Sequence, residues 1–531
     1  MSRYAIGVDF GTESARSLLL DLDSGSELAV EVVAYPSAVI DRTLPGTGEE
    51  LPPDWALQDP DDWVLALEQS VSAVAHEGVA GIGVDFTSCT VLPVAADGAP
   101  LCTLERWRGR RHAWPKLWKH HAAQPVADRL NEVAAERGEE FLERYGGRIS
   151  SEWYFPKLIE LWLEDRELYD AAHGFIEATD WIVWHMTGLE RRQTTTAGYK
   201  AMWSPEAGLP PASYFVAAYP GFDRPAAKLG NSFLPLGTPA GPLRPDVAAR
   251  MGLPASTPVA VGNVDSFVSF PGAGATQPGT FVSAVGTSIC DMVVHPDEIR
   301  LPGVTGVVKD GILPGLYGYE AGQAAVGDML GWFVRQFDSD HGTLEREAAS
   351  LGPGETGLVA LDWWNGNRTV LADADLTGVI CGLTLHSAPH HIYRALLESI
   401  AFGNRRIVEN FVEHGLELDQ IIACGGIANT SPLLMQLFAD ISGLPVHVTG
   451  SSEVAARGAA LFGAVAGGAF KDIGEAVAAT RPPVARTYAP DADAKRAFDE
   501  VYAVYRGLHD LLGRTHVELL HDLKDIRRRL Q

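Results

Sequence analysis

Residues 4–21, YAIGVDFGTESARSLLLD, decide the fold class of this chain. Residues 4–8 form an apolar run that is typical of a buried strand, and residues 9–14 form a turn that contains glycine. Residues 15–21 form a second apolar run. Two apolar runs that are joined by a short glycine-containing turn predict a β-hairpin.

A related unit returns in the second half of the chain. Residues 281–294 read FVSAVGTSICDMVV, so that a strand, a Gly-Thr-Ser turn and a second strand follow one another. Ala284 stands where the first unit has Asp9. Recurrence of the unit indicates two similar domains.

Proline and glycine mark the boundary between these halves. Residues 237–242 and 253–258 are rich in both, and an apolar strand begins directly afterwards. We therefore predict a first domain over residues 1–255, a second over 256–489 and a helical extension over 490–531. Helices that alternate with short apolar strands indicate the α/β class.

The composition is that of a globular protein, since 46% of the 531 residues are hydrophobic and 21% are charged. The 42 basic and 68 acidic side chains give a net charge of −26, which provides no general attraction for nucleic acid or anionic lipid. Five scattered cysteines without a CxxC pair suit a reducing compartment, and acidic residues interrupt the N-terminus where a signal peptide needs an apolar run. We expect a cytoplasmic protein with no membrane or nucleic-acid partner.

Three glycine-containing turns follow apolar runs, at residues 9–12, 286–288 and 424–429. Backbone N–H groups in such turns cradle phosphates. One turn of this kind is usually only a hairpin, whereas three together favour a nucleotide held between two domains. The chain has no Gly-Lys dipeptide and therefore no P-loop. Asp9 would hold Mg²⁺ through water, and its alternative role is to cap the turn.

In combination, these turns resemble those of the FGGY family of carbohydrate kinases, which belongs to the same superfamily as actin and the heat-shock ATPases. Four longer stretches resemble the members that phosphorylate L-ribulose: residues 83–90 (GVDFTSCT), 117–124 (LWKHHAAQ), 145–153 (YGGRISSEW) and 318–323 (GYEAGQ). The resemblance implies two actin-like, ribonuclease-H-like domains with the active site in the cleft between them.

A carboxylate at the end of an apolar strand is the candidate catalytic base. Residues 259–266 read VAVGNVDS, which places Asp265 just past the expected boundary and facing the cleft. Phosphoryl transfer to an alcohol needs a carboxylate that accepts the hydroxyl proton, and an Asp with the ordinary pKa of about 4 is ionised at neutral pH. The residues alone leave open that Asp265 only caps the next helix. The resemblance implies that it is the catalytic Asp.

The resemblance further implies a sugar pocket lined by Asp265, Ser88, Lys200 and Glu320. Lys200 lies in a polar stretch that we expect to be a loop, and the small neighbours of Glu320 leave its carboxylate room to reach a ligand. Without the resemblance, they would be a solvated surface lysine and a salt-bridged loop acid. Relatives can carry Ala at position 88, so we expect a contact there through backbone or shape.

The expected phosphate contacts come from the three turns. They are Gly11, Thr12, Ser14 and Arg16 of the first, Gly286, Thr287 and Ser288 of the second, and Gly425, Gly426 and Asn429 of the third. We expect the Ala- and Gly-rich helix near residues 453–467 to lie beside the adenine, because small side chains allow close approach to a flat base. Tight helix packing without a ligand is the alternative.

The expected activity is phosphorylation of L-ribulose by MgATP to L-ribulose 5-phosphate, a step of L-arabinose degradation, carried out by a homodimer whose small-molecule partners are the sugar and ATP. A kinase of D-ribulose, a xylulose or a pentitol such as ribitol remains an alternative. Further alternatives are a heat-shock-like or actin-like ATPase and an inactive sugar sensor. The ATPase would need a client-binding segment, and residues 490–531 are too few for a separate client domain.

Overall fold

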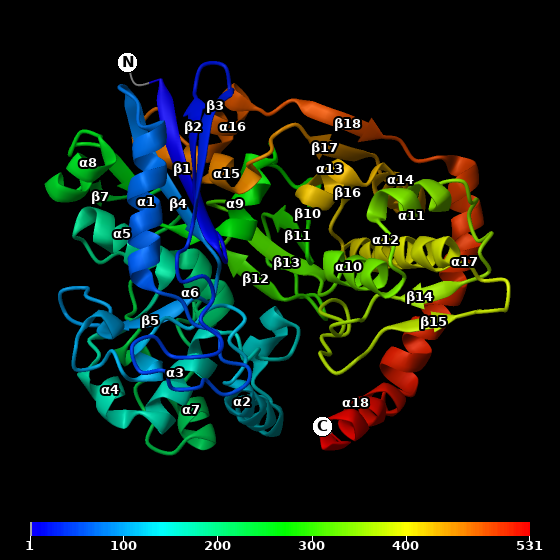
Figure 1. Cartoon of the computed structure of the whole chain (residues 1–531), viewed down its shortest axis with the longest axis horizontal. Coiled ribbons are helices and arrows are strands. Elements are labelled where there is room, and N and C mark those ends of the chain that lie inside the picture. The colour runs from blue at the N-terminus through cyan, green and yellow to red at the C-terminus, as the bar shows by residue number, and fades with distance from the viewer. Residues whose placement is uncertain (1–2, 531) are drawn as a thin grey trace.

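The computed structural model describes residues 3–530 and contains two seven-stranded mixed sheets that lie side by side, each with its own helices (Figure 1). The first sheet has the order β3-β2-β1-β4-β8-β7, and the short strand β9 also pairs with β4. Its strands are β1 (Tyr4–Phe10), β2 (Ser14–Asp21), β3 (Glu27–Ala34), β4 (Val79–Phe86), β7 (Pro239–Pro242), β8 (Pro258–Ala260) and β9 (Asn263–Val264).

The second sheet repeats this arrangement in the order β12-β13-β11-β10-β16-β17-β18. In both sheets a strand pairs antiparallel with the next strand of its hairpin and parallel with a strand from later in the chain, as β1 does with β2 and β4 and β10 does with β11 and β16. The prediction of two similar α/β domains is therefore confirmed. The strands are β10 (Gly279–Val285), β11 (Ile289–His295), β12 (Gly306–Lys309), β13 (Tyr317–Gln323), β16 (Leu418–Cys424), β17 (Val446–Thr449) and β18 (Val484–Tyr488).

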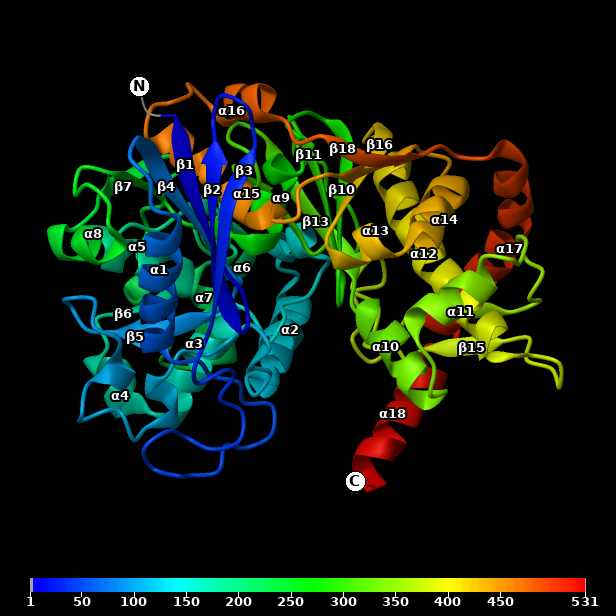
Figure 2. The ribbon, with the colours of Figure 1, turned by 45° about the horizontal axis from the view of Figure 1, so that its top comes forward.

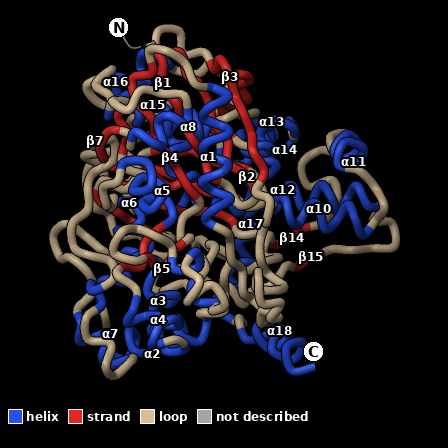
Figure 3. The backbone as a smooth tube through the Cα atoms, turned by 60° about the vertical axis from the view of Figure 1, so that its left-hand side comes forward, coloured by secondary structure: helices blue, strands red, loops and turns tan. Residues whose placement is uncertain are grey.

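Alternation along β1 places helices on both faces of the first sheet. Ile6 and Val8 belong to the core that includes α1 (Pro60–Val74), which crosses in front of the strands in Figure 3. On the opposite face, α15 (Val454–Ala466) packs against β1 and β4. α5 (Ala178–Thr187) and α8 (Pro245–Met251) contribute to the same core as α1, whereas α9 (Asp265–Gly272) and α16 (Ile473–Thr480) pack against α15.

A lobe inserted between β4 and β7 extends below the first sheet (Figure 2). It contains the two-stranded ladder of β5 (Val91–Val94) and β6 (Gly174–Glu177). Its helices are α2 (Gln124–Arg137), α3 (Tyr154–Glu164), α4 (Arg166–Ala171), α6 (Thr194–Ala201) and α7 (Ala212–Ala218).

Helices of the second domain cover its sheet and carry the C-terminal segment. They are α10 (Gly327–Gln336), α11 (His341–Ala348), α12 (Pro389–Glu413), α13 (Gly426–Thr430), α14 (Pro432–Ser442), α17 (Ala492–Asp510) and α18 (Glu518–Leu530), with the hairpin β14 (Val359–Leu361) and β15 (Val379–Cys381). The Tyr502 hydroxyl on α17 donates to Glu409 of α12 at 2.6 Å. The C-terminal helices therefore pack on the second domain. Within residues 3–530, no helix has both the length and the apolar content that a membrane span requires.

The change of sheet comes later than the expected boundary. The strand that we expected to open the second half is β8, which pairs with β4 of the first sheet. The link between the sheets is the stretch 273–278, between α9 and β10. Proline and glycine near residue 255 mark surface turns around α8, and a local pattern does not distinguish these from a domain boundary.

Candidate active site

Parallel pairing of β1 and β4 brings two aspartates to the same edge of the first sheet. Asp9 and Asp85 are partners in the strand register. The phenylalanines that follow them, Phe10 and Phe86, stack with ring centroids 4.9 Å apart. Asp265 joins this edge, because β9 pairs with β4 and ends at the residue before it.

Burial raises the pKa of all three carboxyls. The pKa of Asp265 rises to about 7, first through burial and second through the Asp9 charge. Burial also raises the pKa of Asp9, although Arg16 opposes this with its Nε 3.4 Å from Asp9 Oδ2. The pKa of Asp85 lies well above its usual value because of burial and the charge of Asp9. The expectation of an ordinary pKa for Asp265 is therefore wrong. The residues next to Asp265 in the sequence give no sign of the other two carboxyls.

Asp265 is the first residue of α9, and the N-cap position belongs to Val264. Asp265 Oδ1 accepts a hydrogen bond from the backbone N–H of Ser266 at 2.7 Å. The alternative that Asp265 is the N-cap of this helix is therefore wrong. Its carboxylate is instead fixed at the edge of the first sheet, close enough to the other acids for their charges to affect it.

Lys200 and Glu320 form a buried ion pair between the two domains. Lys200 Nζ donates to Glu320 Oε2 at 3.0 Å, from α6 of the inserted lobe to β13 of the second sheet. Burial alone would lower the pKa of Lys200, but the Glu320 carboxylate holds it above its usual range. Both charges also act on Asp265, so the three groups share one region.

The expected loop around Lys200 is wrong, because these residues form α6. The Gln193 side chain accepts hydrogen bonds from the N–H groups of Thr195 and Thr196 and so caps this helix. Ser88 is half-buried in the turn that follows β4, next to Cys89, whose φ is 62°.

The first two phosphate turns close in the same way. Gly11 N–H donates to Ser14 carbonyl oxygen at 2.9 Å, and Gly286 N–H donates to Ser288 carbonyl oxygen at 2.9 Å. Thr287 at the tip of the second turn is exposed, and the remaining expected contact residues of both turns are half-buried. Both turns thus keep atoms available for a ligand.

The third turn follows β16, directly beside the second, because β10 and β16 are parallel and Ala284 pairs with Cys424. Gly425 has a φ of 93°, and a Cβ there would lie 2.6 Å from the Val285 carbonyl oxygen, so only glycine is suitable. A Cβ on Gly426 would meet nothing within 4 Å. The open space over exposed glycines beside the second turn offers a place for phosphates.

The helix expected beside the adenine has another role. The residues of α15 are almost all buried against the first sheet. A Cβ on Gly7 would lie 1.7 Å from the Ala456 carbonyl oxygen, and a Cβ on Gly83 would lie 1.8 Å from that of Ala459. The small residues therefore allow the helix and sheet backbones to touch. The expected adenine contact is replaced by its alternative, tight packing.

Comparison with known proteins agrees with this architecture. The N-terminal domain of the FGGY family of carbohydrate kinases matches residues 4–272, and the C-terminal domain of the same family matches residues 281–467. This chain belongs to the FGGY family of carbohydrate kinases. The resemblance inferred from the turns is thereby confirmed, and a kinase of this family uses a carbohydrate and ATP as its substrates.

Relatives of this FGGY kinase carry a more specific name. A ribulokinase from Anoxybacillus flavithermus is 46% identical over 98% of this chain and 97% of its own length. A ribulokinase from Mycolicibacterium smegmatis is 41% identical over 97% of this chain and 95% of its own length. A solved structure described as a xyloylose kinase from Brucella ovis has a TM-score of 0.82 at 22% identity, covering 96% of this chain and 99% of that one. That structure shares the two-domain fold.

Sequence reasoning missed two parts of the site in this FGGY kinase. Asp85 had no assigned role, although the tetrapeptide GVDF occurs at both 7–10 and 83–86 and marks two strands that end alike. The second part holds the first turn in place: Gln58 Nε2 donates to the Thr12 carbonyl oxygen at 2.7 Å, and Trp118 Nε1 donates to Thr12 Oγ1 at 3.1 Å. No local signal identifies these contacts.

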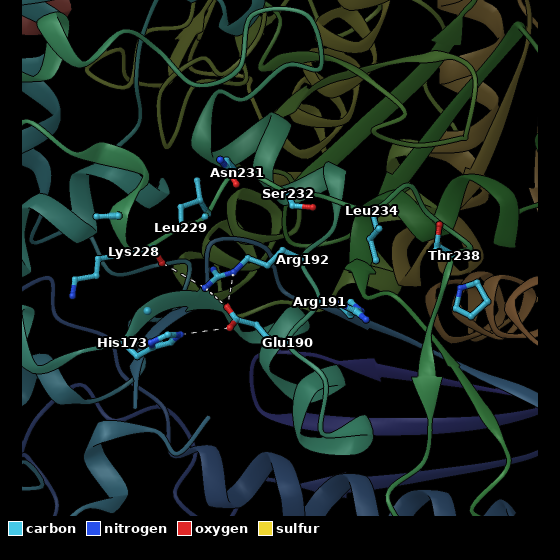
Figure 4. A pocket seen from close by; sticks show the side chains of 14 residues that line it. His173, Glu190, Arg191, Arg192, Lys228, Leu229, Asn231, Ser232, Leu234 and Thr238 are labelled. Carbon is cyan, nitrogen blue, oxygen red and sulfur yellow. Dashed lines mark hydrogen bonds and ion pairs between the residues drawn. The ribbon is translucent and has the colours of Figure 1, made fainter. Parts of the chain in front are cut away.

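The arginines of residues 106–121 are not gathered at this site. Arg106, Arg110 and Arg111 form ion pairs with the acids of 164–167, for example Arg110 with Asp165 at 2.8 Å. A hollow of about 600 Å³ lies elsewhere in the first domain (Figure 4). Its buried cation, Arg192, already pairs with Glu190 at 3.0 Å and with the Phe175 carbonyl oxygen. Neither feature provides a free cation cluster for a phosphate.

Proposed function

We propose that this protein transfers the γ-phosphoryl group of ATP to O5 of L-ribulose and so produces L-ribulose 5-phosphate, a step of L-arabinose degradation. The observation that carries the proposal is the full-length similarity to proteins named ribulokinase, at 41–46% identity for the two relatives described above. The close grouping of Asp265, Lys200 and Glu320 supports a polyol substrate, because its hydroxyls need several polar partners.

In the proposed mechanism, Asp265 is the general base. The O5 oxygen of the sugar bonds to the γ-phosphorus while the bond from that phosphorus to the leaving ADP oxygen breaks, and the hydroxyl proton passes to the Asp265 carboxylate. Lys200 and Glu320 orient the remaining hydroxyls, because the ammonium donates and the carboxylate accepts hydrogen bonds. Their pairing across the domains links sugar binding to the arrangement of the cleft.

The glycine turns would contact the phosphates of ATP. Gly11, Thr12, Ser14 and Arg16 would do so from the first domain, and Gly286, Thr287, Ser288, Gly425, Gly426 and Asn429 from the second. Asn429 donates to the Gly425 carbonyl oxygen at 3.2 Å but stays exposed, so it keeps capacity for a nucleotide. Backbone N–H groups in such turns bind phosphate without any P-loop.

The residues present suit Mg²⁺ held mainly by ATP and water. No set of three or more His, Cys, Asp or Glu side chains within residues 3–530 is arranged to hold a metal ion. Mg²⁺ beside nucleotide phosphates needs only one or two carboxylates, because it keeps several waters. Asp9 would supply one, and a bound cation would offset the carboxylate charges that help to raise the pKa of its two acidic neighbours. When bound, the ion neutralises charge on the transferred phosphoryl group.

ADP release with MgATP across a panel of pentuloses and pentitols tests the proposal. We expect a strong preference for L-ribulose, and Asp265→Asn should lower kcat about 1,000-fold, because general-base assistance contributes about 100- to 10,000-fold. A preference for D-ribulose, a xylulose or ribitol would assign a different substrate. ADP release that is independent of sugar, or full activity of the variant, would favour the ATPase alternative.

We also propose that the protein forms a homodimer through α18. Leu519, Leu523, Ile526 and Leu530 are all exposed and follow the four-three-four spacing of a coiled-coil seam. The other face of the helix is anchored to its own domain, since His521 pairs with Asp373 at 2.8 Å and Arg528 with Asp375 at 3.0 Å. The four exposed apolar side chains, here called the apolar stripe, therefore face away from that anchor.

The charges beside this stripe match a second copy of the chain. In an antiparallel pair of α18 helices, Asp522 of one copy would face Arg529 of the other. Four side chains bury a small area, so we expect a concentration-dependent dimer. Sedimentation velocity should show Leu523→Asp shifting the protein to monomer, whereas Leu163→Asp, at a comparably exposed site on α3, should not. A wild type that stays monomeric at high concentration would contradict this assembly.

A further inference from the structure

The ammonium group of Lys157 joins two loops that lie far apart in the sequence. Lys157 sits on α3 with no exposed surface. Its Nζ donates to the Cys89 carbonyl oxygen at 2.7 Å and to the Leu117 carbonyl oxygen at 2.8 Å. Each acceptor belongs to a segment without regular secondary structure, so the lysine supplies a fixed point for both.

The first of these loops, residues 87–90, carries Ser88. It leaves β4 directly after the edge that holds Asp85, and its Cys89 has a φ of 62°, which non-glycine residues seldom adopt. Thr87 and Thr90 hydroxyls share a hydrogen bond of 2.9 Å across the loop. A strained turn persists when surrounding contacts determine it, and the hydrogen bond from Lys157 is one of these contacts.

The second loop leads to the first phosphate turn. Leu117 is followed by Trp118, whose indole N–H donates to Thr12 Oγ1 at 3.1 Å. A continuous path therefore runs from the loop of Ser88 through Lys157, Leu117 and Trp118 to Thr12.

The lysine itself is held by buried neighbours. Lys116 Nζ donates to the Lys157 carbonyl oxygen at 3.1 Å and to Glu160 Oε2 at 2.5 Å, and His120 Nε2 lies 3.0 Å from the same Glu160 oxygen. Burial alone would raise the pKa of Glu160, but Lys116 and His120 lower it, so the acid stays ionised. A buried ammonium is stable only when its hydrogen bonds are made. The charge of Lys157 therefore depends on its hydrogen bonds to the two loops.

We propose that Lys157 is a positioning residue that keeps the loop of Ser88 and the phosphate turn of Thr12 in a fixed relation to each other. This inference rests on the proposed function, in which the first loop lines the sugar pocket and the second turn contacts ATP. Phosphoryl transfer requires the sugar oxygen and the γ-phosphorus to be held about 3 to 3.5 Å apart and aligned. One cation that holds both loops reduces independent movement of the two substrates.

Lys157→Met removes the donors and keeps the shape of the side chain. We expect kcat to fall about 10- to 100-fold, because a misplacement of about 1 Å can lower a rate 100-fold, and KM to rise several-fold for both sugar and ATP. A purely structural role would lower Tm and leave kcat and both KM values of the folded enzyme unchanged. Values within twofold of the wild type would therefore overturn the proposal.

Two variants serve as controls. Tyr154→Phe, one turn earlier on α3, removes a buried hydrogen bond of 2.9 Å to the Phe175 carbonyl oxygen that leads to neither loop, so its kinetics should match the wild type. Trp118→Phe removes only the last bond of the path and should raise KM for ATP while leaving KM for the sugar unchanged. In the double variant Lys157→Met with Trp118→Phe, the rise in KM for ATP should be smaller than the product of the single effects.

The assays use the best substrate of the wild-type panel, which separates this inference from the proposed function. If L-ribulose is not phosphorylated, the proposed substrate is wrong, and the variants are still compared on the sugar that is. If Lys157→Met does not fold, Trp118→Phe tests the path instead. Trp118 is half-buried and lies outside α3, so we expect this variant to fold. Unchanged KM for ATP in that variant would overturn the path.

Discussion

The two hairpin turns of this FGGY kinase share a backbone and differ in chemistry. Each closes through a hydrogen bond of 2.9 Å from its first glycine. The first follows a buried aspartate, Asp9, and is held by the side chains of Gln58, which precedes α1, and of Trp118 in the inserted lobe. The second follows Ala284, and its backbone instead accepts from the N–H groups that lead into α10, with Val326 N–H donating to the Thr287 carbonyl oxygen at 2.9 Å.

This difference indicates how a duplicated unit acquires two roles. In the proposed function, the first turn combines a phosphate cradle with a carboxylate suited to a cation, whereas the second turn and its neighbour at Gly425 offer backbone groups and open space, with Ala284 in place of the aspartate. A cation and the phosphates it accompanies can then be divided between domains. Variants that exchange or remove the features by which the turns differ test this division.

Exchanging the residue before each turn should have the largest effect. Asp9→Ala makes the first turn like the second, and we expect kcat to fall about 100-fold or more, because charge stabilisation at a transferring group contributes about that much. Titration of activity with Mg²⁺ checks this, since the variant should need more of the ion. Ala284→Asp places a negative charge beside the second turn and should raise KM for ATP about 10-fold. An unchanged Mg²⁺ requirement in Asp9→Ala would contradict the division of roles.

Gly425 and Gly426 separate folding from binding at the third turn. Gly425→Ala forces a positive φ of 93° on a residue with a Cβ that would lie 2.6 Å from a carbonyl oxygen, so we expect a loss of about 1 to 3 kcal/mol in unfolding free energy. Gly426→Ala meets no atom within 4 Å and should leave stability within about 0.5 kcal/mol.

The same pair tests where the phosphates lie. A methyl group at Gly426 would occupy the open space proposed for ATP, so KM for ATP should rise about 10-fold with kcat little changed. Denaturant unfolding and steady-state kinetics measure the two effects separately. Normal KM for ATP in Gly426→Ala would place the phosphates elsewhere.

Asp265→Asn should stabilise the nucleotide-free protein at neutral and higher pH. The unfolded chain loses the proton of this acid near its ordinary pKa of about 4, and the folded chain keeps it until the pKa of about 7. Wild-type stability therefore declines between these pH values and stays reduced above them. The variant lacks this decline, so the difference in Tm in its favour should be larger at pH 8 than at pH 5. Equal differences at both pH values would contradict the raised pKa.

A change remote from both turns should have the smallest effect. Arg106 pairs with Glu167 at 2.7 Å, and both side chains are more than half exposed. Arg106→Gln should alter unfolding free energy by less than about 0.5 kcal/mol and leave both KM values unchanged, because exposed ion pairs contribute little. A clear rise in KM for either substrate would show that the basic stretch takes part in binding.

Local patterns predict the two hairpins and the aspartate that follows a strand, because each rests on a few consecutive residues. The presence of two similar domains also follows from the repetition of this unit. The residues next to Asp265 in the sequence do not indicate that Asp9 and Asp85 lie near it. These two aspartates reach Asp265 through the parallel pairing of distant strands. The loop predicted around Lys200 is a helix because the Gln193 side chain caps it.

The small residues of α15 predicted a ligand contact where the structure shows close packing. An Ala- and Gly-rich helix suits both a flat ligand and a close-packed sheet, and the sequence of α15 contains nothing that separates them. The residues that show that α15 packs against the sheet are Gly7 and Gly83, which lie more than 370 residues earlier in the chain. The residue roles assigned through the family resemblance remain predictions, and the variants above test those of Asp9, Asp265 and Gly426.

The position of α15 has a consequence for how the protein is made. The face of the first sheet that contains Gly7 and Gly83 is covered by residues 454–466, which follow all strands of the second sheet except β18 in the chain. During synthesis on the ribosome, the N-terminal sheet therefore lacks one of its covering layers until the second domain has emerged. A fragment that ends at residue 272 would keep that face bare, so the two halves of this enzyme mature together and not in succession.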